Sequence, residues 1–296
     1  MSEKGQSAPT LIAAIEAGAQ QLSQAGVSFG HGTCNAFDEA AWLVLWRLGL
    51  PLHQLDEHAG QMLSPQQQAQ IDALIQERIT TRKPAAYLTH EAWLQGVSFY
   101  VDERCIVPRS LIAELIADGS IDPWLSADSR TVLDLCTGNG SLAVLAALAY
   151  PEVRVDAADI SSDALEVARI NVEKHGLQER IRLLQSDGLA SIKESYDLIL
   201  CNPPYVNSQS MAVLPAEYRA EPALALAGGS DGMDFIRTLL SQAANHLKPQ
   251  AVLVLEIGHE RSHFEAAFPS LEVVWLETSA GEDQVLLLTH EALLRP

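Results

Sequence analysis

Five short apolar segments, separated by stretches with helical spacing, constrain the fold of this chain more than any other feature. They are VLDLC, VRVDAAD, IRLLQSD, DLILC and AVLVLEIG, at residues 132–136, 153–159, 181–187, 197–201 and 251–258. Strands that alternate with helices pair in parallel and form a sheet covered by helices on both faces. The sequence therefore predicts an α/β fold with a mainly parallel sheet.

Two further apolar segments, residues 271–278 and 284–290, close the chain with almost nothing between them. Parallel strands need a crossover of a dozen or more residues, whereas antiparallel strands need only a short turn. These segments predict an antiparallel pair at the sheet edge, with a tight turn at Gly281-Glu282-Asp283.

The N-terminal part of the chain has a different pattern. From Thr10 to Lys83 apolar residues recur at helical spacing, with breaks at Gly30-His31-Gly32, Pro51 and Ser64-Pro65, which predicts a small all-helical domain. Its apolar stripe is expected to form the helix–helix core; the stripe consists of Trp42, Leu45, Trp46 and Leu48.

Between Ala92 and Val107 the pattern changes to β-prone pieces, WLQGVSFYV and CIVP, with Asp102-Glu103-Arg104 between them. They predict a hairpin between two domains. The expected organisation is a helical domain over residues 1–91, a β-hairpin linker over residues 92–108 and the sheet domain over residues 109–296.

Charge and composition narrow the possible partners. The chain has 38 acidic and 19 basic residues, a net charge of −19, which disfavours polyphosphate backbones and anionic lipid and attracts basic partners. Its four cysteines form no C-x-x-C pair, which indicates reduced thiols. The start, MSEKGQSAPT, is polar, and the longest apolar run, residues 142–150, is far shorter than the ~20 residues of a membrane span. We expect a soluble, cytoplasmic protein without a membrane segment.

Several polar residues and glycines follow the predicted strands at one edge of the sheet, where ligands bind in such folds. Gly138 and Gly140 allow a tight turn after the first strand, although a glycine turn without a ligand is equally compatible with this motif alone. Asp159, 19 residues after Gly140, lies near the spacing at which an acid binds ribose hydroxyls. Asp187 follows the third strand and is predicted to accept a hydrogen bond from an adenine amine.

The type of cofactor follows from what the motif lacks. No Walker loop is present, and Cys136 stands where the dinucleotide fingerprint has its first glycine, so adenosine recognition without a pyrophosphate is favoured. This points to S-adenosylmethionine. The candidate cofactor-binding residues are Asp134, Thr137, Gly138, Asn139, Gly140, Asp159, Asp187 and Asn202.

The fourth strand ends abruptly in Asn202-Pro203-Pro204-Tyr205. Prolines stiffen the loop and remove two N–H donors, which leaves acceptors. The Asn202 side-chain oxygen and the Pro203 carbonyl can accept from one planar NH₂ group, and Tyr205 offers a flat face for it. These four residues are the candidate catalytic residues: they would orient an amide nitrogen for methyl transfer without a strong base. A simple proline turn is the alternative.

Taken together, G-x-G, Asp159, Asp187 and N-P-P-Y resemble the class I S-adenosylmethionine-dependent methyltransferases that modify planar nitrogens. N-P-P-Y is shared by DNA adenine methyltransferases and by protein glutamine methyltransferases of the HemK type. A net charge of −19 without a basic stripe favours the protein branch and excludes direct DNA binding.

The resemblance extends over most of the chain. The helical domain, the hairpin, IVPRSLIAELI (106–116) and the segment from Leu214 to Arg237 resemble the PrmB type of glutamine methyltransferase. This resemblance implies a Rossmann-like class I methyltransferase domain. It also implies methylation of a glutamine side-chain nitrogen in large-subunit ribosomal protein L-three, a basic protein substrate.

The sequence departs from related patterns at three points. Release-factor enzymes typically have P-R-P-D-T-E where this chain has residues 108–113, so a release factor is the second candidate substrate. Leu111 replaces a proline usual in the PrmB type, and Arg109 is expected either to form an ion pair at a helix start or to contact the substrate. Cys136 replaces a class I glycine, which matters little if its backbone conformation is an ordinary one.

Three other interpretations concern the remaining motifs. His259-Glu260-Arg261-Ser262-His263 matches H-E-x-x-H, with His290 as a possible third ligand. This match suggests a zinc hydrolase, but its position directly after a strand argues against one, and no metal is predicted.

A non-catalytic S-adenosylmethionine-binding protein would leave N-P-P-Y unexplained. The loop 228–232 is expected to close over substrate, and Glu217 is expected to pair with Arg219 in a solvated loop.

Overall fold

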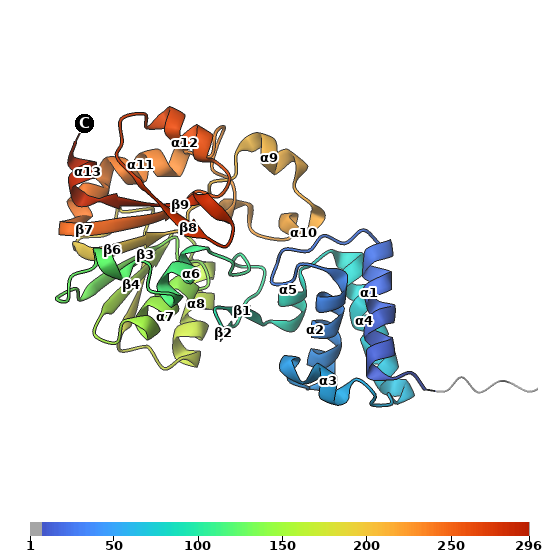
Figure 1. Ribbon diagram of the computed structural model, residues 1–296. Coiled ribbons are helices and arrows are strands. Elements are labelled where there is room, and N and C mark those ends of the chain that lie inside the picture. Colours follow the sequence, from blue (N-terminus) through green and yellow to red (C-terminus); the bar gives the residue numbers. More distant parts are fainter. Residues whose placement is uncertain (1–7, 296) are drawn as a thin grey trace, which may run out of the picture. The chain divides into compact units, whose positions relative to one another are not determined.

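The computed structural model describes residues 8–295, so the first seven residues of the polar start lie outside it. Two compact units are present (Figure 1). The first extends to His90 and includes Pro215–Ala220, and the second comprises Glu91–Leu214 and the chain from Glu221 onwards. The inclusion of residues 215–220 in the first unit was not predicted. The division into a helical domain, a linker and a sheet domain at residues 91 and 108 stays a prediction.

The first unit is helical, as the apolar spacing predicts. Its elements are α1 (Leu11–Gln24), α2 (Ala36–Leu48), η1 (Leu52–Gln54), α3 (Leu55–His58), α4 (Pro65–Thr81), α5 (Ala85–Thr89) and α10 (Ala216–Arg219). Side chains of Thr10, Asn35 and Ser64 cap α1, α2 and α4, which satisfies N–H groups that a helix start leaves without partners. Trp42 and Leu45 are buried as expected, whereas Trp46 and Leu48 are only half-buried.

A buried ion cluster joins the segment 215–220 to the other helices of this unit. Arg78 is fully buried; its Nε donates to Glu39 Oε1 at 2.8 Å and its Nη1 to Glu217 Oε1 at 3.4 Å. Arg82 also donates to Glu217, at 3.3 Å. The expected pairing of Glu217 with Arg219 in a solvated loop is therefore wrong, because two arginines far away in the sequence bury this carboxylate.

The second unit contains the predicted sheet, with seven strands among the described residues, in the order β5-β4-β3-β6-β7-β9-β8. The strands are β3 (Thr131–Leu135), β4 (Arg154–Asp159), β5 (Ile181–Gln185), β6 (Tyr196–Cys201), β7 (Leu247–Glu256), β8 (Val274–Thr278) and β9 (Gly281–Thr289). The first five pair in parallel, and β9 and β8 are antiparallel at the edge. This confirms the predicted fold class.

Two predicted turns are misplaced. Residues 281–283 belong to β9, and the chain reverses at Ser279 and Ala280 instead. The hairpin consists of β1 (Ala92–Leu94) and β2 (Val97–Phe99), which both overlap the first β-prone piece, and residues 105–108 form no strand. Gln95 and Gly96 both have positive φ, 49° and 74°, which is the requirement of the tight turns that match strand twist.

Alternate residues of the strands enter two separate cores. Val132, Leu198 and Val254 face one core, whereas Leu133, Ile199 and Leu255 face the other. Helices α6 (Ile112–Ala117), α7 (Ser141–Ala149) and α8 (Ser162–Lys174) cover the first face, and α11 (Asp234–Gln242), α12 (Arg261–Ala267) and α13 (His290–Leu294) cover the second (Figure 1). The remaining elements are η2 (Asp122–Trp124), α9 (Ser208–Val213), η3 (Ala223–Ala225) and η4 (Ala243–His246).

This topology brings the carboxyl ends of β3, β4, β5 and β6 to one edge of the sheet. In such sheets ligands bind beyond the carboxyl ends of the strands. Within residues 8–295, no helix combines the length and the apolar character needed to cross a bilayer.

Candidate active site

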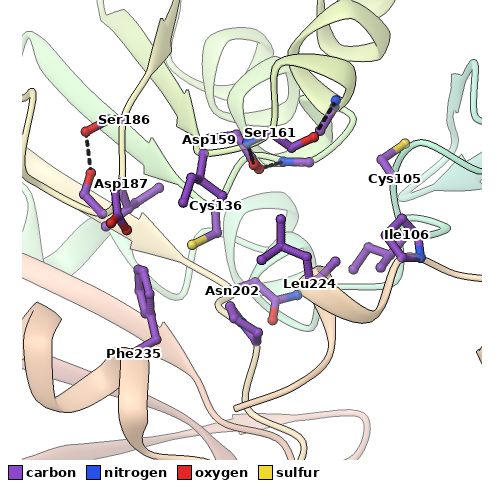
Figure 2. A pocket seen from close by; sticks show the side chains of 18 of the residues that line it. Cys105, Ile106, Cys136, Asp159, Ser161, Ser186, Asp187, Asn202, Leu224 and Phe235 are labelled. Atoms are coloured by element: carbon purple, nitrogen blue, oxygen red, sulfur yellow. Dashed lines mark hydrogen bonds between the residues drawn. The ribbon is translucent and has the colours of Figure 1, made fainter. Parts of the chain in front are cut away.

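A pocket lies at this edge of the sheet, entirely within the second unit (Figure 2). The loops after the four strands line it with Gly138, Asp159, Asp187, Asn202 and Pro204. Its empty volume, including the part open to solvent, is about 850 Å³. Five residues that the sequence predicted as site residues, from the ends of four separate strands, thus line one cavity.

Other candidate residues lie behind the pocket wall and support it. Asp134 is completely buried; its Oδ2 accepts from the Thr137 hydroxyl at 2.5 Å and from the Ala143 N–H at 3.0 Å. The second bond caps the start of α7, where a carboxylate is favourable. Burial raises the pKa of Asp134 to about 7. Asp134 and Thr137 therefore hold the turn rather than line the cavity.

The two glycines of the turn have different reasons to be glycine. Gly140 has a φ of +81°, and a Cβ there would lie 3.1 Å from the Cβ of Ala168 on α8. Gly138 has a φ of +56° with open space around it, so its conformation alone favours glycine. Asn139 is buried, with its backbone carbonyl accepting from Asn171 Nδ2 at 2.9 Å. Gly140 and Asn139 thus fix the turn against α8.

Cys136 adopts a left-handed conformation, with φ +61°. The replacement of glycine here was expected to matter little only if the backbone was ordinary, and this condition is not met. A left-handed conformation costs a non-glycine residue roughly 1–2 kcal/mol. The side chain lines the pocket (Figure 2), and a hydrogen bond with Cys201, followed by burial, raises the pKa of its thiol. The protonated thiol is not a nucleophile.

Asp159 joins two of the loops. Its Oδ2 accepts from the Gly138 N–H and its Oδ1 from the Ser161 N–H, both at 2.9 Å. Burial raises the pKa of this carboxyl, partly offset by these hydrogen bonds. Each carboxylate oxygen has a further lone pair for a ligand hydroxyl.

Asp187 is exposed at the opposite side of the pocket from Ser161, near the ring of Phe235 (Figure 2). Gly188 lies close to that ring: an added Cβ would be 3.6 Å from Phe235 Cε2. An aromatic ring, an acid and a small residue in one corner suit the flat face and the amine of an adenine.

The N-P-P-Y loop follows β6 and divides between the pocket and its support. Asn202 and Pro204 line the pocket, and Pro203 is buried. Tyr205 is half-buried outside the lining, and its hydroxyl lies 3.4 Å from Glu256 Oε1. The loop then runs beside the segment 226–228, with the Val206 N–H donating to the Leu226 carbonyl at 2.8 Å.

Arg109 forms a bidentate ion pair. Its Nη1 and Nη2 donate to Glu221 Oε1 and Oε2 at 2.6 and 2.7 Å, and the Val107 N–H donates to Oε1 at 2.9 Å. Pro222, directly after this buried glutamate, lines the pocket. Arg109 thus anchors one side of the pocket; its contact with the substrate stays a prediction.

The H-E-x-x-H match does not adopt the geometry of a zinc site. His259 and Glu260 precede α12, which begins at Arg261. Glu260 is engaged by Asn207 Nδ2 at 2.6 Å and by His263 Nδ1 at 2.5 Å. No group of three or more metal-binding side chains occurs in the part of the chain that the structure describes.

Comparison with known proteins agrees with this site. The family model "Methyltransferase small domain" matches residues 121–217, and "PrmC N-terminal domain" matches residues 13–89. A "Ribosomal protein uL3 glutamine methyltransferase" of Bordetella pertussis is 53% identical over 96% of this chain and 96% of its own length. The chain belongs to the uL3 glutamine methyltransferase family. Members with the same name from Neisseria meningitidis serogroup B and Bradyrhizobium diazoefficiens are 50% and 45% identical, each over 93% of this chain and 91% and 89% of their own.

Solved structures show the same fold in more distant proteins. The "hMettl16 catalytic domain in complex with MAT2A 3'UTR hairpin 6" superposes with a TM-score of 0.52 at 14% identity, covering 76% of this chain and 81% of that chain. At this identity the likeness concerns the fold of the methyltransferase domain alone.

For this member of the uL3 glutamine methyltransferase family, sequence reasoning missed several pocket residues. Phe235 belongs to an amphipathic helix, and Leu224 follows a buried ion pair; both line the pocket. No local pattern distinguishes either residue from a core residue. Arg104 and Cys105 line it as well, because the turn at residues 102–105, expected to be part of a hairpin, ends at the cavity.

Proposed function

We propose that this chain transfers a methyl group from S-adenosylmethionine to the side-chain amide nitrogen of a glutamine in ribosomal protein uL3. The observation that carries this proposal is the position of Asn202. Its side chain opens into the pocket formed by the glycine turn, Asp159 and Asp187 (Figure 2). An acceptor for amide protons therefore lies at the wall of a cavity suited to an adenosyl group.

The chemistry of the pocket residues fits S-adenosylmethionine. Asp159 would accept from the ribose hydroxyls and Asp187 from the adenine amine, with Phe235 against the ring; these three residues line the pocket. Gly138, held by Asp159, lets the cofactor approach the backbone. When bound, S-adenosylmethionine supplies an electrophilic methyl group on a sulfonium.

The N-P-P-Y loop would bind the acceptor amide. An amide nitrogen is a poor nucleophile because its lone pair is delocalised. Asn202 Oδ1 and the Pro203 carbonyl would each accept one N–H, and the ring of Tyr205 would restrain the plane of the amide. These contacts would orient the amide nitrogen toward the methyl group. The hydrogen bonds to the two acceptors would strengthen as positive charge develops on the nitrogen, which would lower the barrier to methyl transfer without a strong base.

The substrate assignment rests on the named relatives and on charge. The relatives carry the uL3 name over nearly the whole chain, and a protein with a net charge of −19 attracts a basic ribosomal protein. A release factor is the second candidate, since related enzymes with N-P-P-Y act on one. It is disfavoured because residues 108–113 lack the P-R-P-D-T-E pattern.

Transfer of labelled methyl tests the proposal. Ribosomal proteins and release factors from cells lacking this gene would be incubated with the enzyme and labelled S-adenosylmethionine, and mass spectrometry would locate the label. We expect label on a glutamine of uL3 with the native enzyme and almost none with Asn202→Ala, whose affinity for S-adenosylmethionine falls much less. Label on a release factor alone would show that the release factor, and not uL3, is the substrate. Equal labelling by the native enzyme and by Asn202→Ala would overturn the role of the N-P-P-Y loop.

A further inference from the structure

The ring of Tyr205 lies directly on the backbone of Gly258, two residues beyond the end of β7. A Cβ built on Gly258 would be 2.5, 2.9 and 3.2 Å from Cε2, Cζ and Cδ2 of the Tyr205 ring. Contacts below 3.0 Å do not occur between real side chains, because packed atoms approach to about 3.5–4.0 Å. Any side chain at this position would displace the ring.

Glu256 lies beside the hydroxyl of the same ring. Its carboxylate is 4% exposed; Oε2 accepts from the Ser110 hydroxyl at 2.6 Å and from the Leu111 N–H at 2.9 Å. These bonds hold Oε1 within 3.4 Å of the Tyr205 hydroxyl. The hydroxyl contact alone is long, but the carboxylate that makes it is fixed. The Leu111 N–H is a donor that a proline at this position would lack.

Two more glycines enclose the backbone of Tyr205. A Cβ on Gly228 would lie 2.7 Å from the Tyr205 Cα, and one on Gly232 would lie 2.2 Å from its carbonyl oxygen. The Gly228 N–H also donates to the Val206 carbonyl at 2.9 Å. The loop 228–232, expected to close over substrate, is here packed against the N-P-P-Y loop. Tyr205 is therefore held at both its backbone and its ring.

We propose that Gly258 and Glu256 are positioning residues that fix the plane of the Tyr205 ring and, through it, the plane of the acceptor amide. This inference rests on the proposed function, because it assigns the ring a role in methyl transfer to an amide. A misplacement of about 1 Å can cost on the order of 100-fold in rate. Neither residue lines the cofactor pocket, so their effect should fall on turnover and not on cofactor binding.

The test compares two glycine-to-alanine variants. Gly258→Ala moves the ring and strains a backbone with φ +53°, whereas Gly176→Ala strains a backbone with φ +67° but meets no atom within 4 Å. Both should lower the melting temperature through backbone strain, and Gly258→Ala should lower it further because its Cβ also overlaps the Tyr205 ring. We expect kcat to fall at least about 10-fold in Gly258→Ala alone, with S-adenosylmethionine affinity within two-fold of native in both. Equal kcat in the two variants, or a loss of cofactor affinity that matches the loss of kcat, would overturn the inference.

A double-mutant cycle distinguishes an effect on kcat through the Tyr205 ring from an effect through general destabilisation of the fold. If Gly258 acts through the ring, Gly258→Ala should cause no further loss of kcat in a Tyr205→Ala background. Likewise Glu256→Gln should lower kcat in the native background but not in Tyr205→Phe, which lacks the hydroxyl. Additive losses in either cycle would contradict the inference.

Asn202→Ala separates this inference from the proposed function. An inactive Asn202→Ala with a fully active Gly258→Ala would overturn only the positioning role. An active Asn202→Ala would overturn the acceptor assignment on which both depend.

Discussion

The backbone N–H of Gly138 donates to Asp159 Oδ2 at 2.9 Å. The acid that ends β4 therefore holds the glycine turn that follows β3, so one carboxylate both shapes the pocket and faces into it. The second oxygen of Asp159 accepts from the Ser161 N–H at 2.9 Å, next to the start of α8. Loss of this side chain should affect the pocket and the ligand together.

Asp159→Ala should reduce affinity for S-adenosylmethionine strongly. A hydrogen bond to a charged group contributes about 1.5–3 kcal/mol, which corresponds to roughly 10- to 100-fold in the dissociation constant. Isothermal titration calorimetry of the full chain would measure it. Asp163→Ala, which removes an exposed acid in the first turn of α8, is the matched control and should change affinity less than two-fold. An unchanged dissociation constant in Asp159→Ala would rule out the ribose assignment.

Asp134 predicts a specific dependence of stability on pH. Burial raises its pKa from 3.8 to about 7, so the folded state binds this proton more tightly than the unfolded state does. Its stabilising contribution is complete below pH ~4 and is lost as the pH rises through 7. Between pH 5 and pH 8 the native chain should lose roughly 2–3 kcal/mol of unfolding free energy through this group.

Asp134→Asn tests this dependence. A single oxygen, Oδ2, accepts both hydrogen bonds of Asp134, so an asparagine oxygen can replace it without a titrating proton. Because asparagine resembles the protonated carboxyl, denaturant titrations at several pH values should show similar stabilities at pH 5, with the native chain becoming less stable than the variant as the pH rises to 8. Parallel curves would show that Asp134 does not titrate in this range.

The sequence predicted the features that depend on local pattern. Period and spacing located the five parallel strands, and the acids and glycines that follow them could be placed at one edge because parallel strands share an orientation. Asp159, Asp187 and Asn202 line one cavity for this reason.

Side-chain pairs between segments that are distant in the sequence could not be predicted from it. Arg78 with Glu217, and Arg109 with Glu221, are separated by 139 and 112 residues. Nothing local shows that these glutamates are buried, because burial depends on the path of the chain between α9 and η3. The hairpin turn at Gln95-Gly96 was missed for a different reason: its signal, two positive φ values, lies in the backbone and glutamine does not indicate it.

Cys136 predicts an unusual response to substitution. Cys136→Gly relieves a left-handed conformation that costs about 1–2 kcal/mol and adds about 0.4–1 kcal/mol of unfolded-state entropy. The unfolding free energy should therefore stay within about 1 kcal/mol of native. Cys136→Val places a β-branched residue at φ +61° and should destabilise the protein. Urea denaturation would measure the unfolding free energies of both variants. A Cys136→Gly variant less stable than Cys136→Val would show that the backbone at this position is not strained.

Arg109 was expected either to form an ion pair at a helix start or to contact the substrate, and one experiment separates the two roles. The Glu221 carboxylate is buried and loses both guanidinium hydrogen bonds if Arg109 is removed. Breaking a buried pair costs about 3–5 kcal/mol, so Arg109→Ala should lower the unfolding free energy by about the lower of these values because the arginine is partly exposed. Arg109→Ala/Glu221→Gln should recover much of the loss, since no unpaired charge remains. A native melting temperature together with a raised KM for the protein substrate would instead show that Arg109 binds the substrate.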